Sequence, residues 1–525
     1  MKKRASESYL IISSAHLGVS KDILSVLKQV VAFYKPKIIH LGPLVEPKTV
    51  KKYEKLNQRI YKMSQSELTE AAEERLLNLI EERDSIEEAQ DKTVETLTEA
   101  FGKVEFVLNQ DQMTPKTSYK RASFLLDGKE LSKYLYLSPI LPSSETSAND
   151  PFSQRAMEYL RQFGQSCIVA HPVPSAKSMP RIGLNEAYNY WSVGSLRHQE
   201  NPKNTKTQYL VTHLPSAILV LVDKENGEFH PKALHFDYLE RTSHSRKHPI
   251  ILDDGQVFLE NKTIQVGSPD KANFITDQHA KHWQPGVLAC FRAANTLHQP
   301  EVIIDGGDTA DMGGSNRHAE DHPGEMIGEY VRHDLIHLKG LLKAMNNEKC
   351  IKRKIMLDSN HHEWLSLRCA RDPALIGLLD WPTLAREMFS DWQIMIRKAG
   401  ETDIFWFGDY MLRHGDKESG AANGAKLSAL GKYMCGHWHS FKMFRRAIQL
   451  GCGCMLGPKY VGGKITSWQN MLATLTKYKE ITAVNPKTIL HDKTKKASRF
   501  AYRGTIYEVP EFNLVVNLNE AIYAK

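Results

Sequence analysis

The second half of the chain contains a series of short apolar segments that each end in a cluster of Asp, Asn or His, and this series is the strongest constraint on the fold. Runs such as Phe274–Thr276 and Val302–Ile304 are typical of buried strands. In an open α/β sheet, ligands bind beyond the carboxyl ends of the strands, so these clusters are expected to meet. In chain order, the clusters are Asp277-x-His279, Gly307-Asp308-x-x-Asp311, Asn360-His361, His414-Gly415 and Gly436-His437-x-His439.

The residue types in these clusters predict a metal centre. Asp, Asn and His are ligands for a borderline-hard divalent ion. Asp277 and His279 are two residues apart, so they lie on one face of an extended segment. A glycine precedes both Asp308 and His437, which allows a sharp turn and a close approach of the backbone.

The ordered set of clusters resembles the calcineurin-like metallophosphoesterase superfamily over residues 277–439. The resemblance implies an α/β fold in which a β-sandwich is flanked by helices. It also implies two metal sites: Asp277, His279 and His439 for one ion, Asn360, His414 and His437 for the other, and Asp308 bridging both. The implied catalytic residue is His361, which would face the scissile phosphate and stabilise the transition state or protonate the leaving oxygen.

Two ions held in this way would lower the pKa of a bridging water and supply hydroxide for in-line attack on a phosphoester. Oxygen and imidazole donors without thiolate favour Mn²⁺, with Mg²⁺, Zn²⁺ or Fe²⁺ as alternatives.

Several features leave alternatives open. Ser359 replaces the glycine usual before Asn-His in this superfamily, and His362 stands where an acid is usual, so Glu363 is a candidate for that acid's role. His318 and His322 are expected to touch substrate, with a solvated loop as the alternative. A structural zinc site is a rival interpretation, although its C-x-H-x-H and C-x-C spacing is unusual; it would use Cys435, His437, His439, Cys452 and Cys454.

The first half of the chain carries a weaker version of the same pattern. Four of its residues occupy the places of ligands or of the catalytic histidine and cannot replace them: Ser14, Pro43, Gln110 and Ser195. The spacings are similar, because positions 14 and 43 are 29 residues apart and positions 277 and 308 are 31 apart. We therefore expect a degenerate copy of the fold that binds no dinuclear centre, with an unrelated α/β domain as the alternative.

The expected organisation is a degenerate domain over residues 1–245 and a catalytic domain over 265–525, with Arg241–His248 as the linker. Residues 62–100 hold twelve acidic and four basic residues and no Gly or Pro, which predicts a helical insertion. Ser64–Glu67 is a candidate capping box at its start. The insertion is a solvated element or a partner-binding hairpin, and self-association of the chain is a reasonable expectation.

Composition excludes several classes of protein. A hydrophobic content of 41% and a charged content of 25% are ordinary globular values, so a mainly disordered or fibrous protein is excluded. No apolar run is long enough to span a membrane, so no membrane partner is expected. Seven cysteines without a C-x-x-C pair favour a reducing, cytoplasmic location.

Net basic charge and two cationic, aromatic segments favour DNA as the substrate. The net charge is +8. Phe441–Arg446 includes the expected substrate contacts Arg445 and Arg446, and Lys493–Arg503 forms a C-terminal basic and aromatic extension. A solvated surface is the alternative for each segment.

The superfamily includes DNA-repair exonucleases and a phage nuclease that degrades host DNA, so the resemblance implies a two-metal deoxyribonuclease that could act in a host cytoplasm. The alternatives are a phosphodiesterase or phosphatase for small or protein substrates, and a non-catalytic interaction protein.

Overall fold

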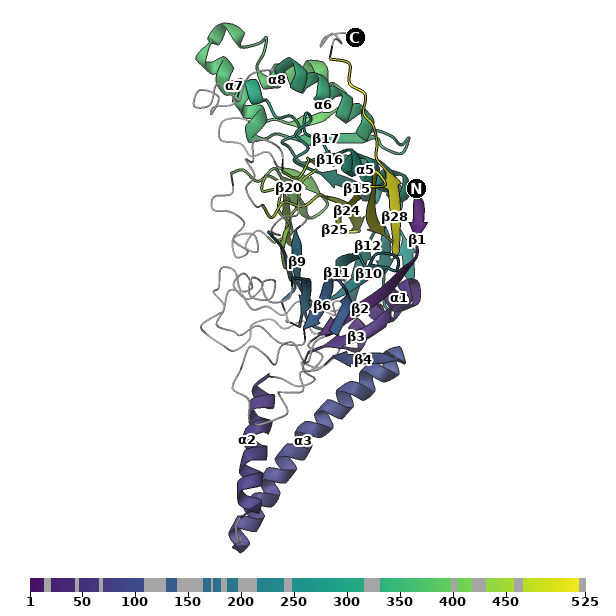
Figure 1. The fold of residues 1–525 in the computed structure, drawn as a ribbon, viewed down its shortest axis with the longest axis vertical. Helices are drawn as coiled ribbons and strands as arrows, with labels where there is room; N and C mark the ends of the chain where they lie inside the picture. The colour runs from purple at the N-terminus through teal and green to yellow at the C-terminus, as the bar shows by residue number, and fades with distance from the viewer. Residues whose placement is uncertain are drawn as a thin grey trace.

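The computed structural model of the chain describes residues 1–13, 20–42, 47–65, 69–107, 129–138, 164–170, 173–180, 187–196, 215–239, 248–315, 331–397, 404–417, 431–457 and 466–518. These residues form an α/β structure of mixed sheets and helices (Figure 1).

The N-terminal half is built on an eight-stranded sheet with the order β14-β13-β12-β11-β10-β2-β3-β4. Strands β2, β3 and β4 are parallel, and β10 and β11 continue the sheet in antiparallel pairing. The strands are β2 (Ser6–Ser13), β3 (Lys37–Leu41), β4 (Val104–Val107), β10 (Ser216–Asp223), β11 (Phe229–Leu239), β12 (His248–Asp253), β13 (Gln256–Phe258) and β14 (Thr263–Gln265).

The C-terminal half is built on a six-stranded sheet with the order β18-β17-β16-β15-β24-β25. Strands β15 to β18 are parallel, and β24 and β25 are antiparallel. The strands are β15 (Lys271–Ile275), β16 (Val302–Asp305), β17 (Arg353–Leu357), β18 (Gln393–Met395), β24 (Met471–Tyr478) and β25 (Ile481–Thr488).

A ten-stranded sheet runs through both halves in the order β19-β20-β21-β23-β22-β8-β9-β7-β6-β5. The halves join where β8 pairs with β22. The strands from the N-terminal half are β5 (Lys129–Ser132), β6 (Leu135–Ser138), β7 (Ser166–Val169), β8 (Ser175–Met179) and β9 (Tyr188–Ser192). Those from the C-terminal half are β19 (Phe405–Phe407), β20 (Tyr410–Arg413), β21 (Tyr433–Cys435), β22 (Lys442–Phe444) and β23 (Ala447–Gln449).

Five strands of the eight-stranded sheet have the same order and directions as five strands of the six-stranded sheet, and the two parts of the ten-stranded sheet also match each other. The parallel strands β2, β3 and β4, flanked by β10 and β11, correspond to β15, β16 and β17, flanked by β24 and β25. In the shared sheet, β5-β6-β7-β9-β8 corresponds to β19-β20-β21-β23-β22. Both halves therefore present the carboxyl ends of equivalent strands at equivalent places.

Alternation along the strands places apolar side chains on both faces of each sheet. Ile11 and Ile304 belong to the core between the ten-stranded sheet and the other two sheets. Their neighbours in sequence face helices: Ile12 packs with α1 (Lys21–Tyr34), and Ile303 packs with α5 (Pro285–His298) and α6 (Val331–Met345). Each half is thus a two-sheet sandwich with helices on its outer face.

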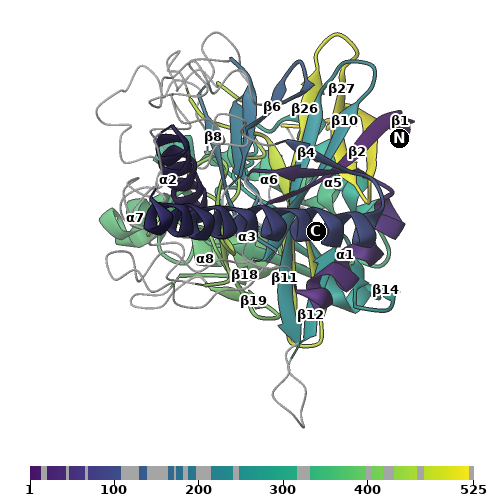
Figure 2. The same ribbon diagram turned by 90° about the horizontal axis from the view of Figure 1, so that it is seen from below.

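The helical insertion predicted over residues 62–100 begins earlier, at Pro47, and forms a long hairpin that projects from the N-terminal half (Figures 1 and 2). It consists of α2 (Pro47–Ser64) and α3 (Glu70–Phe101). The predicted capping box at Ser64 is wrong, because α2 ends at Ser64, whose hydroxyl donates to the carbonyl of Tyr61, and Thr69 is the N-cap of α3. The long helix therefore starts after the capping pattern.

The two ends of the described chain meet in a four-stranded sheet with the order β1-β28-β27-β26. Its strands are β1 (Lys2–Arg4), β26 (Leu490–Asp492), β27 (Ala497–Tyr502) and β28 (Thr505–Pro510). The buried Arg4 contacts Asp223 and Glu508 here. Most of the predicted linker, residues 241–247, lies outside the described residues, and the domain division stays a prediction.

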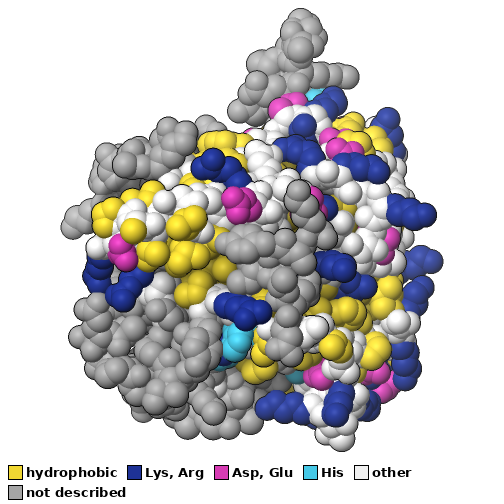
Figure 3. Space-filling view, turned by 90° about the horizontal axis from the view of Figure 1, so that it is seen from above, with side chains coloured by type: hydrophobic (Ala, Val, Ile, Leu, Met, Phe, Trp, Pro, Cys, Tyr) yellow, Lys and Arg dark blue, Asp and Glu magenta, His cyan; other side chains and the backbone are white. Residues whose placement is uncertain are grey.

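The end of the molecule that carries the C-terminal half exposes apolar side chains (Figure 3). Here α7 (Asn360–Arg371) is followed by a short 3₁₀ helix, η8 (Pro373–Leu375), and by α8 (Trp381–Met388). Leu367, Ile376, Leu378 and Leu379 are exposed. None of the described helices combines the length and the apolarity that crossing a membrane requires.

Candidate metal centre

The predicted clusters come from strand ends in two different sheets of the C-terminal half. Strands β15, β16 and β17 end at Ile275, Asp305 and Leu357 in the six-stranded sheet, and β20 and β21 end at Arg413 and Cys435 in the ten-stranded sheet. The loops that follow these five strands converge. The centre is therefore formed between the two layers of a sandwich, whereas the sequence pattern alone suggested one open sheet.

The first group of side chains is Asp277, His279 and His439, whose potential ligand atoms lie within 4.8 Å of one another. Nε2 of His439 lies 3.4 Å from Oδ1 of Asp277 and 3.2 Å from Nε2 of His279. All three residues are buried. These are the residues that the resemblance assigned to one ion.

The second group is Asp308, His414 and His437, again within 4.8 Å of one another. Nε2 of His414 lies 3.1 Å from Oδ2 of Asp308 and 3.2 Å from Oδ1 of Asn360, the first residue of α7. Nδ1 of His437 lies 3.9 Å from the same Asp308 oxygen. The structure thus brings together the residues assigned to the other ion.

Five of the seven candidate ligands have a left-handed backbone conformation. The φ angles are 52° at Asp277, 44° at His279, 47° at Asp308, 70° at His437 and 57° at His439. Non-glycine residues adopt this conformation uncommonly, and such residues cluster at functional sites. The packing of this half therefore holds the loops in a conformation that their own backbone preferences disfavour.

Two glycines permit this packing. A Cβ atom on Gly436 would lie 2.4 Å from Oδ2 of Asp277, and a Cβ on Gly307 would lie 2.7 Å from Nδ1 of His414. The amide of His437, directly after Gly436, donates to both carboxylate oxygens of Asp277 at 2.9 Å. The two glycines therefore allow the backbone to approach Asp277 and His414 closely, as predicted, because a side chain at either position would collide with these residues.

The charges of the centre favour cations at these positions. Burial favours neutral groups, yet the carboxylate of Asp308 raises the pKa of His414 to about 10. Despite its own burial, Asp308 has a pKa held well below the ordinary value by His361 and His414. Nε2 of His414 contacts two acceptors, Oδ2 of Asp308 and Oδ1 of Asn360. These oxygens stabilise a positive charge at this position.

Unpartnered polar atoms in the second group fit a divalent ion. Oδ1 of Asp308 and Nδ1 of His437 are buried and have no hydrogen-bond partner among the described residues. Unpaired buried polar atoms cost free energy, and a metal ion removes that cost. Asp, Asn and His donors also suit Mn²⁺ and related ions. The residues present therefore fit a two-metal centre.

Asp311 has a role that the sequence analysis did not assign. Its Oδ1 lies 2.9 Å from Nδ1 of His279, and this contact holds the pKa of the otherwise buried carboxyl at about 2. A carboxylate behind a ligating imidazole fixes the ring orientation and its tautomer. In the sequence, the signal that could have indicated this role was the short spacing of Asp308-x-x-Asp311.

His361 lies beside the two groups and belongs to neither of the two assigned ligand sets. Its Nδ1 donates to the carbonyl oxygen of Asp311 at 2.7 Å, and its Nε2 lies 3.7 Å from Oδ2 of Asp308. The ring also packs on Trp364, with centroids 4.0 Å apart. One nitrogen is therefore fixed by the backbone while the other faces the centre, and burial lowers the pKa of the ring to about 4.

The departures from the usual motif have structural consequences. His362 is fully buried and stacks on Trp381 with centroids 4.1 Å apart. Glu363, the candidate for the missing acid, pairs with Lys417 at 3.1 Å. The atom that orients His361 is instead the carbonyl oxygen of Asp311.

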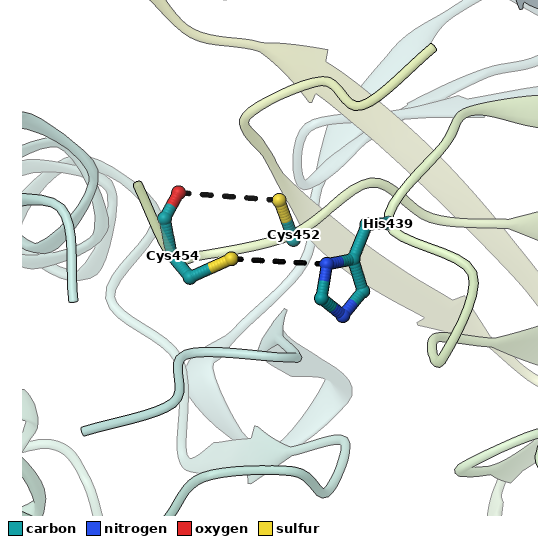
Figure 4. A group of neighbouring side chains, drawn as sticks. All are labelled: His439, Cys452 and Cys454. Carbon is teal, nitrogen blue, oxygen red and sulfur yellow. Dashed lines mark hydrogen bonds between the residues drawn. The ribbon is translucent and has the colours of Figure 1, made fainter. Parts of the chain in front are cut away.

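The structure brings together some of the residues of the rival zinc site (Figure 4). Sγ of Cys454 lies 3.8 Å from Nδ1 of His439, and Sγ of Cys452 lies 4.0 Å from the carbonyl oxygen of Cys454. Of the five proposed zinc ligands, these three form a group, and His437 belongs to the group around Asp308. In the metal-free protein, burial raises the pKa of the Cys454 thiol well above its usual value.

Two of the four predicted substrate contacts lie among the described residues. His318 and His322 lie outside the described residues. Arg446 pairs with Asp237 at 2.6 Å. Because β21 and β23 are parallel, Arg446, just before β23, lies at the opposite end of the sheet from His437, which follows β21. Arg445, in the same turn, has a φ of 56°. The substrate roles of all four residues stay predictions.

Comparison with known proteins adds solved structures of low similarity. No protein-family model and no curated protein matches the chain. A "predicted phosphoesterase" from Streptococcus pneumoniae matches with 11% identity and a TM-score of 0.21, over 47% of this chain and 98% of that one. The nuclease MPE of Pseudomonas putida matches with 13% identity and a TM-score of 0.21, over 48% and 100%. PhoD matches with 7% identity and a TM-score of 0.23, over 51% and 72%. Because these TM-scores are low, we base the function on the site itself.

Proposed function

We propose that this chain is a metal-dependent phosphodiesterase that cleaves DNA, with two divalent ions, Mn²⁺ favoured. Asp277, His279 and His439 would hold one ion, and Asn360, His414 and His437 the other, with Asp308 between them. The observation that supports this most is the presence of two oxygen- and imidazole-bearing groups, one of Asp277, His279 and His439 and the other of Asp308, His414 and His437. When bound, such ions polarise the phosphate and activate water at neutral pH.

His361 supplies the proton transfer in this proposal. The hydrogen bond from Nδ1 to the Asp311 carbonyl leaves Nε2 as the atom that faces the centre. With a pKa of about 4, the ring is neutral in the free enzyme at pH 7. An anionic phosphate beside Nε2 favours the protonated ring, so substrate binding prepares His361 to protonate the leaving oxygen.

We also infer that the N-terminal half is a degenerate copy of the catalytic half. The shared order of five strands in each sheet of the two halves supports this inference. Gly42 after β3 and Gly307 after β16 share a φ of 95°. In that strand order β7, and not β9, corresponds to β21, so Ser195, which follows β9, does not occupy the position of His437 that the sequence pattern predicted. On this basis metal analysis is expected to find about two ions per chain rather than four.

DNA cleavage by purified protein tests the proposal. Linear and covalently closed DNA are incubated with Mn²⁺, with Mg²⁺ or with EDTA, beside the His361→Ala variant. We expect cleavage that requires both metal and His361, and cleavage of the closed circle would identify endonuclease action. Hydrolysis of a small phosphodiester without cleavage of either DNA would replace the nuclease by a small-substrate phosphodiesterase.

A further inference from the structure

A cavity of about 260 Å³ lies between the two halves, one side chain away from the metal centre. Tyr188 and Asn189 of β9 form part of its wall in the N-terminal half, and Trp468 and Gln469 form part of its wall in the C-terminal half. The indole of Trp468 also packs on the ligand candidate His439, with ring centroids 4.1 Å apart. Trp468 therefore contacts both the cavity and the candidate metal centre.

The position of this wall is fixed by hydrogen bonds from both halves. The main-chain amide of Gln469 donates to the carbonyl of His439 at 2.9 Å. On the other side of Trp468, the hydroxyl of Ser178 in β8 donates to the carbonyl of Ser467 at 2.8 Å. The cavity is thus part of the same rigid framework that holds His439.

Two buried amide side chains in the cavity wall have oxygens without partners. Asn189 is 7% exposed and Gln469 is 5% exposed. Oδ1 of Asn189 and Oε1 of Gln469 have no hydrogen-bond partner among the described residues. Because a buried acceptor without a partner is costly, these two oxygens favour a ligand that carries N–H groups.

The remaining wall favours a flat, partly apolar ligand. The aromatic residues Tyr134, Tyr188, Phe229 and Trp468 all line the cavity. Its carboxylate, Glu228, is neutralised by Arg499 through two contacts of 2.7 Å. Aromatic rings stack on nucleobases, and amide oxygens accept hydrogen bonds from the amino groups of the bases.

A second cavity, of about 590 Å³, shares Glu228, Asn470 and His491 with the first and is also lined by Lys493. Lys493 is exposed. The aromatic cavity thus adjoins a surface with an exposed basic side chain, and basic side chains contact the phosphates of a nucleic-acid strand.

We propose that this cavity binds one unstacked nucleobase of the strand whose phosphate lies at the metal centre. The proposal rests on the nuclease function above and specifies how its substrate is recognised. A base is separated from its own phosphate by a single sugar, and the cavity is separated from His439 by the single side chain of Trp468. The N-terminal half, without metal ligands of its own in the pattern, then contributes a wall of the substrate site.

Abasic interference tests this proposal with the full-length, Mn²⁺-loaded protein. A set of single-stranded oligonucleotides of one sequence, each with one abasic position, is digested, and the rate at each phosphate is read from a gel. We expect one abasic position, at a fixed distance from each phosphate, to slow cleavage there by about tenfold, because stacking of one base contributes this much. The Asn189→Leu and Tyr188→Ala variants are expected to cut intact DNA about tenfold more slowly and to show no further loss at that abasic position.

The controls separate this proposal from the nuclease function. Asn261→Leu makes the same change at an exposed position between β13 and β14 and is expected to keep the full abasic effect. Melting curves and Mn²⁺ content verify the fold of each variant, and Tyr188→Ala serves if Asn189→Leu does not fold. Cleavage of DNA with an equal abasic effect in wild type and variants would overturn the base pocket and leave the nuclease intact. Hydrolysis of bis(p-nitrophenyl) phosphate without any cleavage of DNA would overturn both.

Discussion

The Nε2 atoms of His279 and His439 lie 3.2 Å apart, although the two residues are 160 positions apart in the chain. The other nitrogen of each ring faces a separate group: Asp311 at 2.9 Å from His279 and Cys454 at 3.8 Å from His439. With Nδ1 of His279 bonded to a carboxylate, the two Nε2 atoms converge beside the carboxylate of Asp277. A divalent cation is the species that such converging donors bind.

Replacing Asp308 is expected to remove metal from both groups, because the proposal assigns its carboxylate to both ions. Metal analysis of Asp308→Ala after incubation with Mn²⁺ and gel filtration should find less than one ion per chain, against about two in the wild type. Asp391→Ala, at an exposed carboxylate paired with Lys354, is the matched control and should retain both ions. Full metal content in the Asp308 variant would contradict the assignment.

Replacing His361 should separate chemistry from metal binding. His361→Ala is expected to lower kcat by about 10²- to 10⁴-fold, the usual contribution of one acid–base group, while the Mn²⁺ content stays unchanged. The reason is that its Nε2 faces the centre from outside both assigned ligand sets. His248→Ala, on β12 in the other half, is the control. A variant that keeps wild-type kcat would disprove the role of His361.

Gly307→Ala is expected to damage the centre through a steric contact. Its added Cβ would lie 2.7 Å from Nδ1 of His414, so the ring must move and metal affinity must fall. Gly377 is a matched control, because its φ of 84° is also left-handed and a Cβ there meets nothing within 4 Å. Both variants should lose some stability from backbone strain, of order 1 kcal/mol. Loss of Mn²⁺ in titrations should occur in Gly307→Ala alone, and equal loss in both would point to strain as the cause.

Buried neutral histidines should make the protein less stable in acid. His298 is fully buried, and burial lowers its pKa to about 3. Between this value and the unfolded pKa of about 6.5, the unfolded chain binds the extra proton, so stability is present above pH 6.5 and falls as the pH is lowered. The contribution of this residue is about 1.4 kcal/mol per pH unit within that window.

Urea unfolding at pH 5.0 and pH 6.5 measures this effect. His298→Gln keeps a donor and an acceptor near Leu475 and Tyr502 but cannot take up a proton. The variant should therefore show a shallower dependence of the unfolding free energy on pH than the wild type. Identical slopes would mean that His298 is not the group that titrates.

The local parts of the fold could be predicted from the sequence because their signals are local. The strand before Asp277 was expected at Phe274–Thr276 and is Lys271–Ile275, and the strand expected at Val302–Ile304 is Val302–Asp305. Apolar periodicity reports which face of an element is buried, and this depends on neighbours a few residues away. The start of α3 was misplaced because a capping pattern is short and occurs by chance; the N-cap is Thr69.

Other features depend on contacts between distant segments. Arg446, read from its cationic neighbourhood as a substrate contact, pairs with Asp237 of the other half. Arg499, in the basic C-terminal segment, is buried against Glu228. A run of charges in a sequence does not reveal which of them a remote carboxylate neutralises, because that partner is chosen by the pairing of strands.

The sequence by itself determined which side chains are available for the centre: carboxylates, one amide and imidazoles at strand ends, with glycines where backbones approach. The tertiary structure alone decided that these strand ends belong to two sheets, that Asp311 orients both His279 and His361, and that a cavity between the halves adjoins Trp468. The physical reason is that residue type fixes chemistry and local conformation, whereas the distances between donors follow from how two sheets pack over a shared apolar core.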